Sequence, residues 1–254
     1  MSLSVKRSAF VSVLFIVVSF LAITIFQQQM FIRRTQSAIN DFNYRFGQYR
    51  AIYYAGLNAN EGDSPQAEVN QQLRGLQSTT SFLSFFNIAT LYMRGQENLI
   101  DPFNYIHPPF NLERFWLDTD IIGYLSIPAI GLELPVFLGT SPHNLNRGLA
   151  HLTHSSFPVG GESTHTVIAG HRHLHNARVF RGIESLDVGD EILFTNFYRT
   201  LVYEVVGSQI IHPSQTDALL IRSNMDLISL VTQYSVGFNR NRYRIVVTAS
   251  RVGY

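Results

Sequence analysis

Cysteine is missing from all 254 residues of this sequence. Its absence excludes disulfide bonds, thiolate metal sites and a cysteine nucleophile from the chain. The chain also lacks an excess of positive or negative charge, because it has 19 Lys and Arg residues and 18 Asp and Glu residues. A chain with this balance has no electrostatic footprint for nucleic acid, so we expect no polyelectrolyte partner.

Apolar residues, by contrast, are plentiful and begin with a long uncharged run near the N-terminus. Hydrophobic residues make up 46% of the chain, enough for one substantial domain with an extension. No charge interrupts the segment from Ser8 to Phe26, about 19 residues, which is the length that crosses a hydrocarbon core. Because no small-residue cleavage site follows, the run predicts an uncleaved membrane anchor over residues 8–30 and not a signal peptide.

The charges beside this anchor predict its orientation. Lys6 and Arg7 favour a cytoplasmic end at residues 1–7, although Arg33 and Arg34 on the far side weaken the positive-inside argument. We therefore expect a single-pass protein of the cell membrane whose remaining chain is extracellular.

Residues 31–116 are predicted to form a helical extension. Within residues 35–54 the apolar side chains recur every three or four positions, which is the period of an amphipathic helix. A second helical pattern covers residues 67–76. The apolar stripe of the first segment has to pack against another part of the molecule.

The end of this extension carries a loop with the sequence Asp101, Pro102, Phe103. Proline fixes the backbone between an acid and an aromatic residue, so both side chains can be presented together to a neighbouring surface. An ordinary turn is the alternative interpretation of these three residues.

From Ile121 onward the sequence changes to short strand-like runs separated by turn residues. This pattern is typical of an all-β barrel or sandwich, and it assigns residues 117–254 to one β domain. Short helices are predicted near residues 177–186 and 215–221. The predicted strands are residues 121–127, 134–137, 165–169, 191–195, 200–206, 208–212, 227–232 and 243–249.

The stretch from Gly161 to Arg172 is the strongest candidate for a functional site. Residues 166–169 form an apolar run with glycines on both sides, the pattern of a buried strand that ends abruptly. His171 follows that end, where its ring can face a cleft, and an imidazole with a pKa of about 6.5 suits proton transfer near neutrality. A purely structural histidine is the alternative.

Several motifs in this order resemble those of class C sortases, the membrane-anchored transpeptidases that polymerise pilins on Gram-positive bacteria. The resemblance covers roughly residues 101–252 and implies a mainly β fold, a sortase-type eight-stranded β-barrel with an N-terminal membrane helix and a helical extension. The matching segments are Asp101–Phe103, Ile122–Pro128, Leu134–Ser141, Gly161–Arg172 and Val231–Gln233, followed by Gly237, Asn239 and Arg242 at matching offsets.

The resemblance also implies roles for individual residues. In that family a cysteine thiolate attacks the threonine carbonyl of an LPXTG-like sorting signal, and a pilin lysine resolves the thioacyl intermediate. His171 would transfer the protons, and Arg242 would donate charge-assisted hydrogen bonds to the substrate carbonyl or oxyanion. Asp101 would pair with Arg242, and Phe103 would fill the nucleophile pocket as a lid. Pilin subunits are the implied partners, and no metal or cofactor is expected.

Gln233 stands where the family has its cysteine. A neutral amide cannot form an acyl-enzyme, so we expect a pilus-assembly sortase relative that has lost catalysis and still binds a sorting signal or a partner sortase. One alternative is a hydroxyl nucleophile at Ser235, Thr232 or Tyr234, which would need a nearby base.

A metal-binding module is the other alternative. His171, His173 and His175 alternate as ligands on one strand face do, and His151, His154 and His165 lie upstream.

Overall fold

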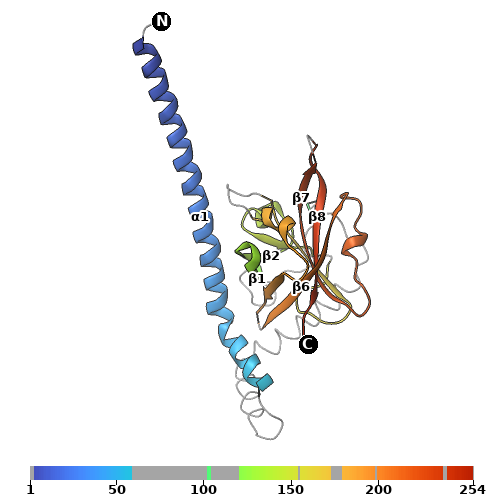
Figure 1. Ribbon diagram of the computed structural model, residues 1–254. Coiled ribbons are helices and arrows are strands. Elements are labelled where there is room, and N and C mark those ends of the chain that lie inside the picture. The colour runs from blue at the N-terminus through green and yellow to red at the C-terminus, as the bar shows by residue number, and fades with distance from the viewer. Residues whose placement is uncertain are drawn as a thin grey trace.

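A computed structural model describes residues 3–58, 102–103, 120–153, 155–172, 179–197, 199–236 and 239–253. Side chains are described for these residues apart from 3–11, 48–58, 181, 236 and 239–242. Within these ranges one long helix, α1 (Leu3–Asn58), lies beside a closed β-barrel (Figure 1). The predicted helix over residues 67–76 lies outside them.

Eight strands form the described barrel, which confirms the predicted barrel and excludes a sandwich. They close in the order β1-β2-β3-β4-β7-β8-β6-β5, and β5 pairs back onto β1. The pairs β2–β3 and β4–β7 are parallel, and the other neighbours are antiparallel. The bounds are β1 Ile121–Ile127, β2 Leu132–Leu138, β3 Leu149–His151, β4 Thr164–Ala169, β5 Glu191–Thr195, β6 Thr200–Ile211, β7 Asp226–Val236 and β8 Asn239–Arg251.

The sequence pattern did not predict one of these strands and predicted another as two separate strands. β3 has three residues, too few for a recognisable alternation of apolar and polar positions. The runs predicted separately over residues 200–206 and 208–212 form the single strand β6, whose register against β8 shifts between Val205 and Gly207. Such a bulge interrupts the alternation without ending the strand. The two predicted helices contain the short 3-10 helices η3 (Arg181–Ser185) and η4 (Asp217–Leu219).

Helix α1 joins the predicted membrane anchor and the amphipathic segment into one continuous helix. Neither proline nor glycine stands between Gln27 and Thr35, so no residue there interrupts the backbone hydrogen bonds. Its stretch from Ser12 to Gly47 is long and apolar enough to cross a membrane. The N-terminal part of the helix extends past the barrel (Figure 1), as a membrane anchor would.

Aromatic side chains hold the part of α1 around residues 42–46 against the barrel. Phe42 and Phe46, two members of the predicted apolar stripe, are buried. Their ring centroids lie 5.2 and 4.5 Å from that of Phe197, and Phe42 also meets Tyr124 edge to face at 6.1 Å. Each such pair adds roughly 0.5–1.5 kcal/mol beyond the burial of area. This part of the helix is therefore packed onto the folded domain.

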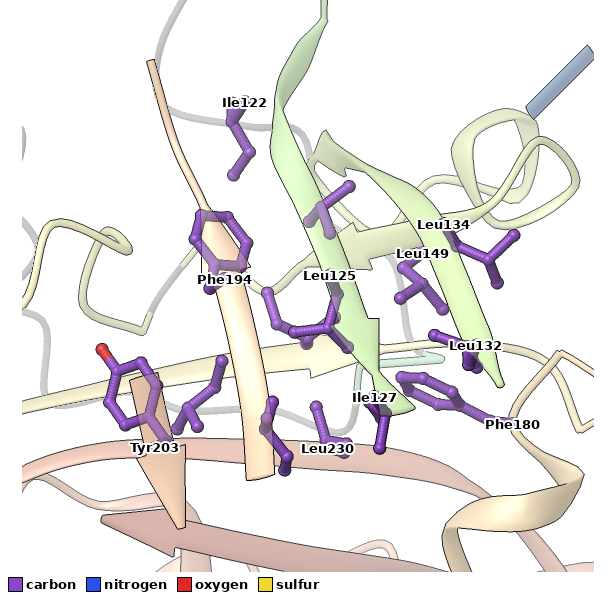
Figure 2. Close-up of a cluster of buried hydrophobic side chains, with 14 of the residues drawn as sticks. Ile122, Leu125, Ile127, Leu132, Leu134, Leu149, Phe180, Phe194, Tyr203 and Leu230 are labelled. Atoms are coloured by element: carbon purple, nitrogen blue, oxygen red, sulfur yellow. The ribbon is translucent and has the colours of Figure 1, made fainter. Parts of the chain in front are cut away.

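The interior of the barrel is filled by apolar side chains from alternate strand positions. Leu125 of β1, Phe194 of β5 and Leu230 of β7 are fully buried in one cluster (Figure 2). Truncating one such side chain to alanine typically costs about 2–5 kcal/mol, because the cavity left behind is only partly refilled. The packed interior gives β4, β7 and β8 a rigid backing for the side chains on their outer face.

Candidate functional site

Three neighbouring strands, β4, β7 and β8, place candidate site residues in one row. Gln233 of β7 directly faces Arg244 of β8 in the antiparallel register. Side chains directly opposite each other project to the same side of a sheet. β4 runs parallel to β7 on its other side, with Ala169 beside Val231, and two more residues in that register bring His171 beside Gln233. The sheet thus aligns the imidazole of His171, the amide of Gln233 and the guanidinium of Arg244. These three residues form the row.

His171 is held in place through Gly170. The N–H of Gly170 donates to the carbonyl of Val231 at 3.1 Å, and the hydroxyl of Thr232 donates to the carbonyl of Gly170 at 2.7 Å. These bonds extend the pairing of β4 with β7 beyond the end of the strand. A Cβ at Gly170 would lie 2.6 Å from Cδ2 of Leu149, so a larger residue here would force the Leu149 side chain to move.

Phe103 lies over the row. Its ring centroid is 5.9 Å from the imidazole of His171 and 4.9 Å from the guanidinium carbon of Arg244. Phe103 also packs on the apolar outer face of the same strands, against clusters that include Val231 and Ala169. The aromatic residue of the predicted lid is therefore in contact with the candidate site. Asp101 lies outside the described residues, so the ion pair predicted for it stays a prediction.

Arg244, which the sequence patterns did not single out, is the arginine that faces Gln233. It is 6% exposed and stacks on Phe103. The side chain of Arg242 lies outside the described part of the chain, and the role predicted for it stays a prediction. Counting offsets cannot identify facing residues here, because β7 and β8 shift register between Tyr234 and Val236. The available signal was an arginine directly before the apolar run at residues 245–247.

The row carries a single fixed positive charge. Burial lowers the pKa of His171, so its imidazole is neutral at neutral pH, and the guanidinium of Arg244 supplies the positive charge. Arg172, the neighbour of His171, forms a salt bridge of 2.8 Å with Glu184, and its guanidinium carbon lies 5.5 Å from the ring centroid of Tyr234. The site offers hydrogen-bond donors and acceptors suited to a peptide backbone.

The hydroxyl groups near Gln233 differ in how far they are presented to a substrate. Thr232 is 1% exposed, and its hydroxyl donates to the carbonyl of Gly170. This geometry does not offer Thr232 as a nucleophile. Ser235 is exposed and lies where the register of β7 against β8 shifts, so its orientation does not follow from strand alternation. A nucleophilic role for Ser235 stays a prediction.

His165 lies on the outer face of β4, further along the strand from the row. Its Nδ1 lies 2.8 Å from the carbonyl oxygen of Leu220 and must donate there, because a carbonyl only accepts. Its Nε2 therefore accepts from the hydroxyl of Ser229 at 2.7 Å. Burial lowers the pKa of His165 to about 4, which keeps the ring neutral. These bonds give His165 a structural role.

His151 is a second structural histidine. Its Nε2 lies 3.0 Å from the carbonyl oxygen of Ser156 and donates to it, while Nδ1 has no hydrogen-bond partner among the described atoms. Burial lowers its pKa to about 4 as well. The described residues hold no cluster of three metal-ligating side chains. His154, His173 and His175, which the metal-binding alternative also used, lie outside them.

Comparison with known proteins identifies the barrel. A family model described as a sortase domain matches residues 125–252. This chain belongs to the sortase family.

Two proteins of similar sequence are sortases as well. Sortase D of Bacillus subtilis is 30% identical over 131 residues, which are 51% of this chain and 63% of that protein. Sortase A of Bacillus anthracis is 32% identical over 133 residues, or 52% of this chain and 60% of that one. The chain thus spans about three fifths of the length of the curated relatives it matches.

Among solved structures, sortase C2 of Group B Streptococcus Pilus Island 1 superposes with a TM-score of 0.61 at 31% identity, covering 69% of this chain and 99% of that one. The chain is therefore structurally close to class C pilus sortases.

Proposed function

We propose that this protein is a membrane-anchored relative of the pilus sortases that binds LPXTG-like sorting signals of pilin subunits without cleaving them. Its single-pass anchor is α1, and its barrel is extracellular. One observation carries the proposal. An amide, Gln233, occupies the centre of a row whose flanking imidazole and guanidinium are both present, in a chain without cysteine.

Binding requires only what the row and its surroundings supply. The guanidinium of Arg244 can donate to a peptide carbonyl, and the neutral imidazole of His171 can accept from a peptide amide. Gln233 both donates and accepts, so its amide can hydrogen-bond the threonine carbonyl that a thiolate would attack. Displacement of Phe103 would open the apolar face beneath it to the leucine and proline side chains of the signal.

Catalysis by the family route requires more than the row supplies. A nucleophile has to form a bond to the threonine carbonyl carbon and expel the glycine amine, which takes up a proton. The amide nitrogen of Gln233 is not nucleophilic, because its lone pair is delocalised into the carbonyl. The route is therefore closed at its first step.

Restoring the nucleophile tests this proposal. We expect the unmodified full-length protein to bind an LPXTG-type peptide without turning it over, and the Gln233→Cys variant to cleave it. In that background His171→Ala should lower the rate by about 10²- to 10⁴-fold, the usual contribution of a positioned acid or base. Peptide binding by fluorescence anisotropy and cleavage by chromatography are the two measurements.

The outcomes of this experiment test the loss of catalysis and the binding function separately. Turnover by the unmodified protein would overturn the loss of catalysis, and an acyl adduct on Ser235 found by mass spectrometry would support the hydroxyl nucleophile in its place. Failure to bind the peptide would overturn the binding function. The His171→Ala variant is the control that ties any rescued activity to the row.

A further inference from the structure

A cavity of about 580 Å³ lies between α1 and the barrel, away from the row of His171, Gln233 and Arg244. Helix α1 forms one wall, with residues at helical spacing from Phe26 to Ala38. The other wall comes from Phe137 of β2 and from Asn146 and Arg147, which follow the short helix α4 (Pro142–Leu145). The volume lies within the range of roughly 300–1,000 Å³ typical of ligand sites.

The lining of this cavity separates apolar from cationic surface. Phe26, Met30 and Phe31 line it near the end of the apolar run of α1, whereas Arg34 and Arg147 supply positive charge. Arg147 is partly neutralised by Asp120 at 2.7 Å, and its guanidinium carbon stacks 4.2 Å from the ring centroid of Phe137.

Arg34 is exposed and forms no ion pair with any residue that the structure describes. The lining thus combines an arginine that has no ion-pair partner among the described residues with an apolar surface that suits lipid acyl chains.

The position of the cavity along α1 adds a second argument. The apolar run of the helix ends at Phe26, where three glutamines follow, and the first charges after it are Arg33 and Arg34. If α1 spans the membrane, the cavity lies where the hydrocarbon region gives way to the headgroups. Phosphates of anionic lipids lie at this depth, and an arginine guanidinium binds them through paired charge-assisted hydrogen bonds.

A neighbouring cavity, which shares Phe31 and Thr35 with the first, provides a built-in comparison. A second cavity of about 1030 Å³ lies between the helix and residues 130–134 of the barrel. Its described lining contains Glu133 and no Lys or Arg side chain. The two cavities flank the same helix at the same depth, and only the first has the charge to hold an anion.

We propose that the cavity lined by Arg34 and Arg147 binds the phosphodiester headgroup of an anionic membrane phospholipid. Arg34 contacts the phosphate, Arg147 and Asn146 complete the polar side, and the acyl chains leave along Phe26 and Met30. The bound lipid fills the gap between α1 and β2 and thereby fixes the barrel on the membrane surface. This inference rests on the proposed membrane anchoring of α1 and not on peptide binding.

Lipid retention by the full-length protein tests the proposal. The protein is placed in nanodiscs of equimolar phosphatidylglycerol and phosphatidylcholine, and native mass spectrometry counts the lipids that remain bound after release. We expect the unmodified protein to retain phosphatidylglycerol preferentially and Arg34→Gln to lower that retention about fivefold to tenfold. Arg33→Gln is the matched control, because it removes the same charge at a neighbouring position that does not line the cavity.

The possible results separate the explanations. Equal losses for Arg34→Gln and Arg33→Gln, or no preference for phosphatidylglycerol, would overturn the site and indicate general surface electrostatics. Arg34-dependent binding of soluble glycerol phosphate with equal strength would overturn the lipid as occupant. A chain that fails to float with liposomes would overturn the anchoring and this inference together. A chain that floats without lipid preference overturns the inference alone, and unchanged thermal melts of both variants exclude misfolding.

Discussion

Gln233 brings no charge to its neighbours in the row. A thiolate at this position would stabilise a protonated histidine beside it, because opposite charges within a few ångströms favour the charged form. The amide offers no such charge, so burial alone acts on His171 and lowers its pKa. The imidazole is then a neutral hydrogen-bonding group, which suits the peptide binding proposed for this site.

Two arginines of β8, Arg244 and Arg242, are expected to differ in their effect on peptide binding. Arg244→Gln should weaken binding of an LPXTG-type peptide by about tenfold or more, because a charge-assisted hydrogen bond contributes roughly 1.5–3 kcal/mol. Arg242→Gln, matched in charge and placed two residues away, should change it less than about twofold. Fluorescence anisotropy with both variants checks the order, and the reverse order would assign the site to Arg242.

Acid should destabilise the barrel through His151 and His165. Both have a pKa of about 4 in the folded protein against about 6.5 in the unfolded chain, so the unfolded state binds more protons as the pH falls from 6.5 to 4. Stability is therefore full above pH 6.5 and falls by about 3 kcal/mol per histidine by pH 4.

The structure gives the reason for these shifts. A proton on Nδ1 of His151 would find no acceptor among the described atoms, and one on Nε2 of His165 would point at a hydroxyl that now donates to it. Thermal melts of the full-length protein between pH 7 and 4 check the expected loss of stability. The slope should flatten in His165→Asn and remain in His143→Asn, which changes an exposed histidine. An unchanged slope in His165→Asn would contradict the assignment.

At the scale of the element, the strands approach each other too closely for ordinary residues at certain positions. Gly123 of β1 lies against β5, where a Cβ would clash with the carbonyl oxygen of Thr195 and lie 2.9 Å from Cζ of Phe194. A glycine that reads as a weak strand residue in the sequence is thus required by the neighbouring strand.

Alanine at two glycines should therefore have opposite effects. Gly123→Ala should lower the free energy of unfolding by about 1–3 kcal/mol, because β1 and β5 have to move apart. Gly47→Ala in α1, where an added Cβ meets nothing within 4 Å, should raise helix stability by about 0.5–1 kcal/mol. Chemical denaturation of both variants measures the difference. Equal effects would mean that β1 relaxes without cost.

At the scale of the whole molecule, the position of α1 relates the row to the membrane. The hairpin of β7 and β8 points to the same side as the N-terminal end of α1, whereas the chain leaves the barrel at the opposite end (Figure 1). Gln233 and Arg244 lie in the half of these strands next to the hairpin. With α1 anchored as proposed, Gln233 and Arg244 lie in the half of the barrel nearer the membrane.

Much of the barrel was predictable because its strands are local patterns. Ile121–Ile127 and Glu191–Thr195 were predicted with the observed bounds, since alternation and turn residues mark both ends. The bulge at Gly207 was not, because a single small residue inside a strand looks like a break between two strands. Arg244 was missed for a related reason, since the register shift in the hairpin changes which residues face each other.

The sequence alone established that no thiol exists to carry the family reaction, that an apolar helix precedes a β domain, and that a histidine follows an abruptly ending strand. These properties depend on residue identity and on patterns a few residues long. Only the tertiary structure decided that α1 runs unbroken onto the barrel, that Phe103 covers the row, and that Arg244 faces Gln233. Those facts depend on pairing between segments far apart in the chain, which bulges and packing determine.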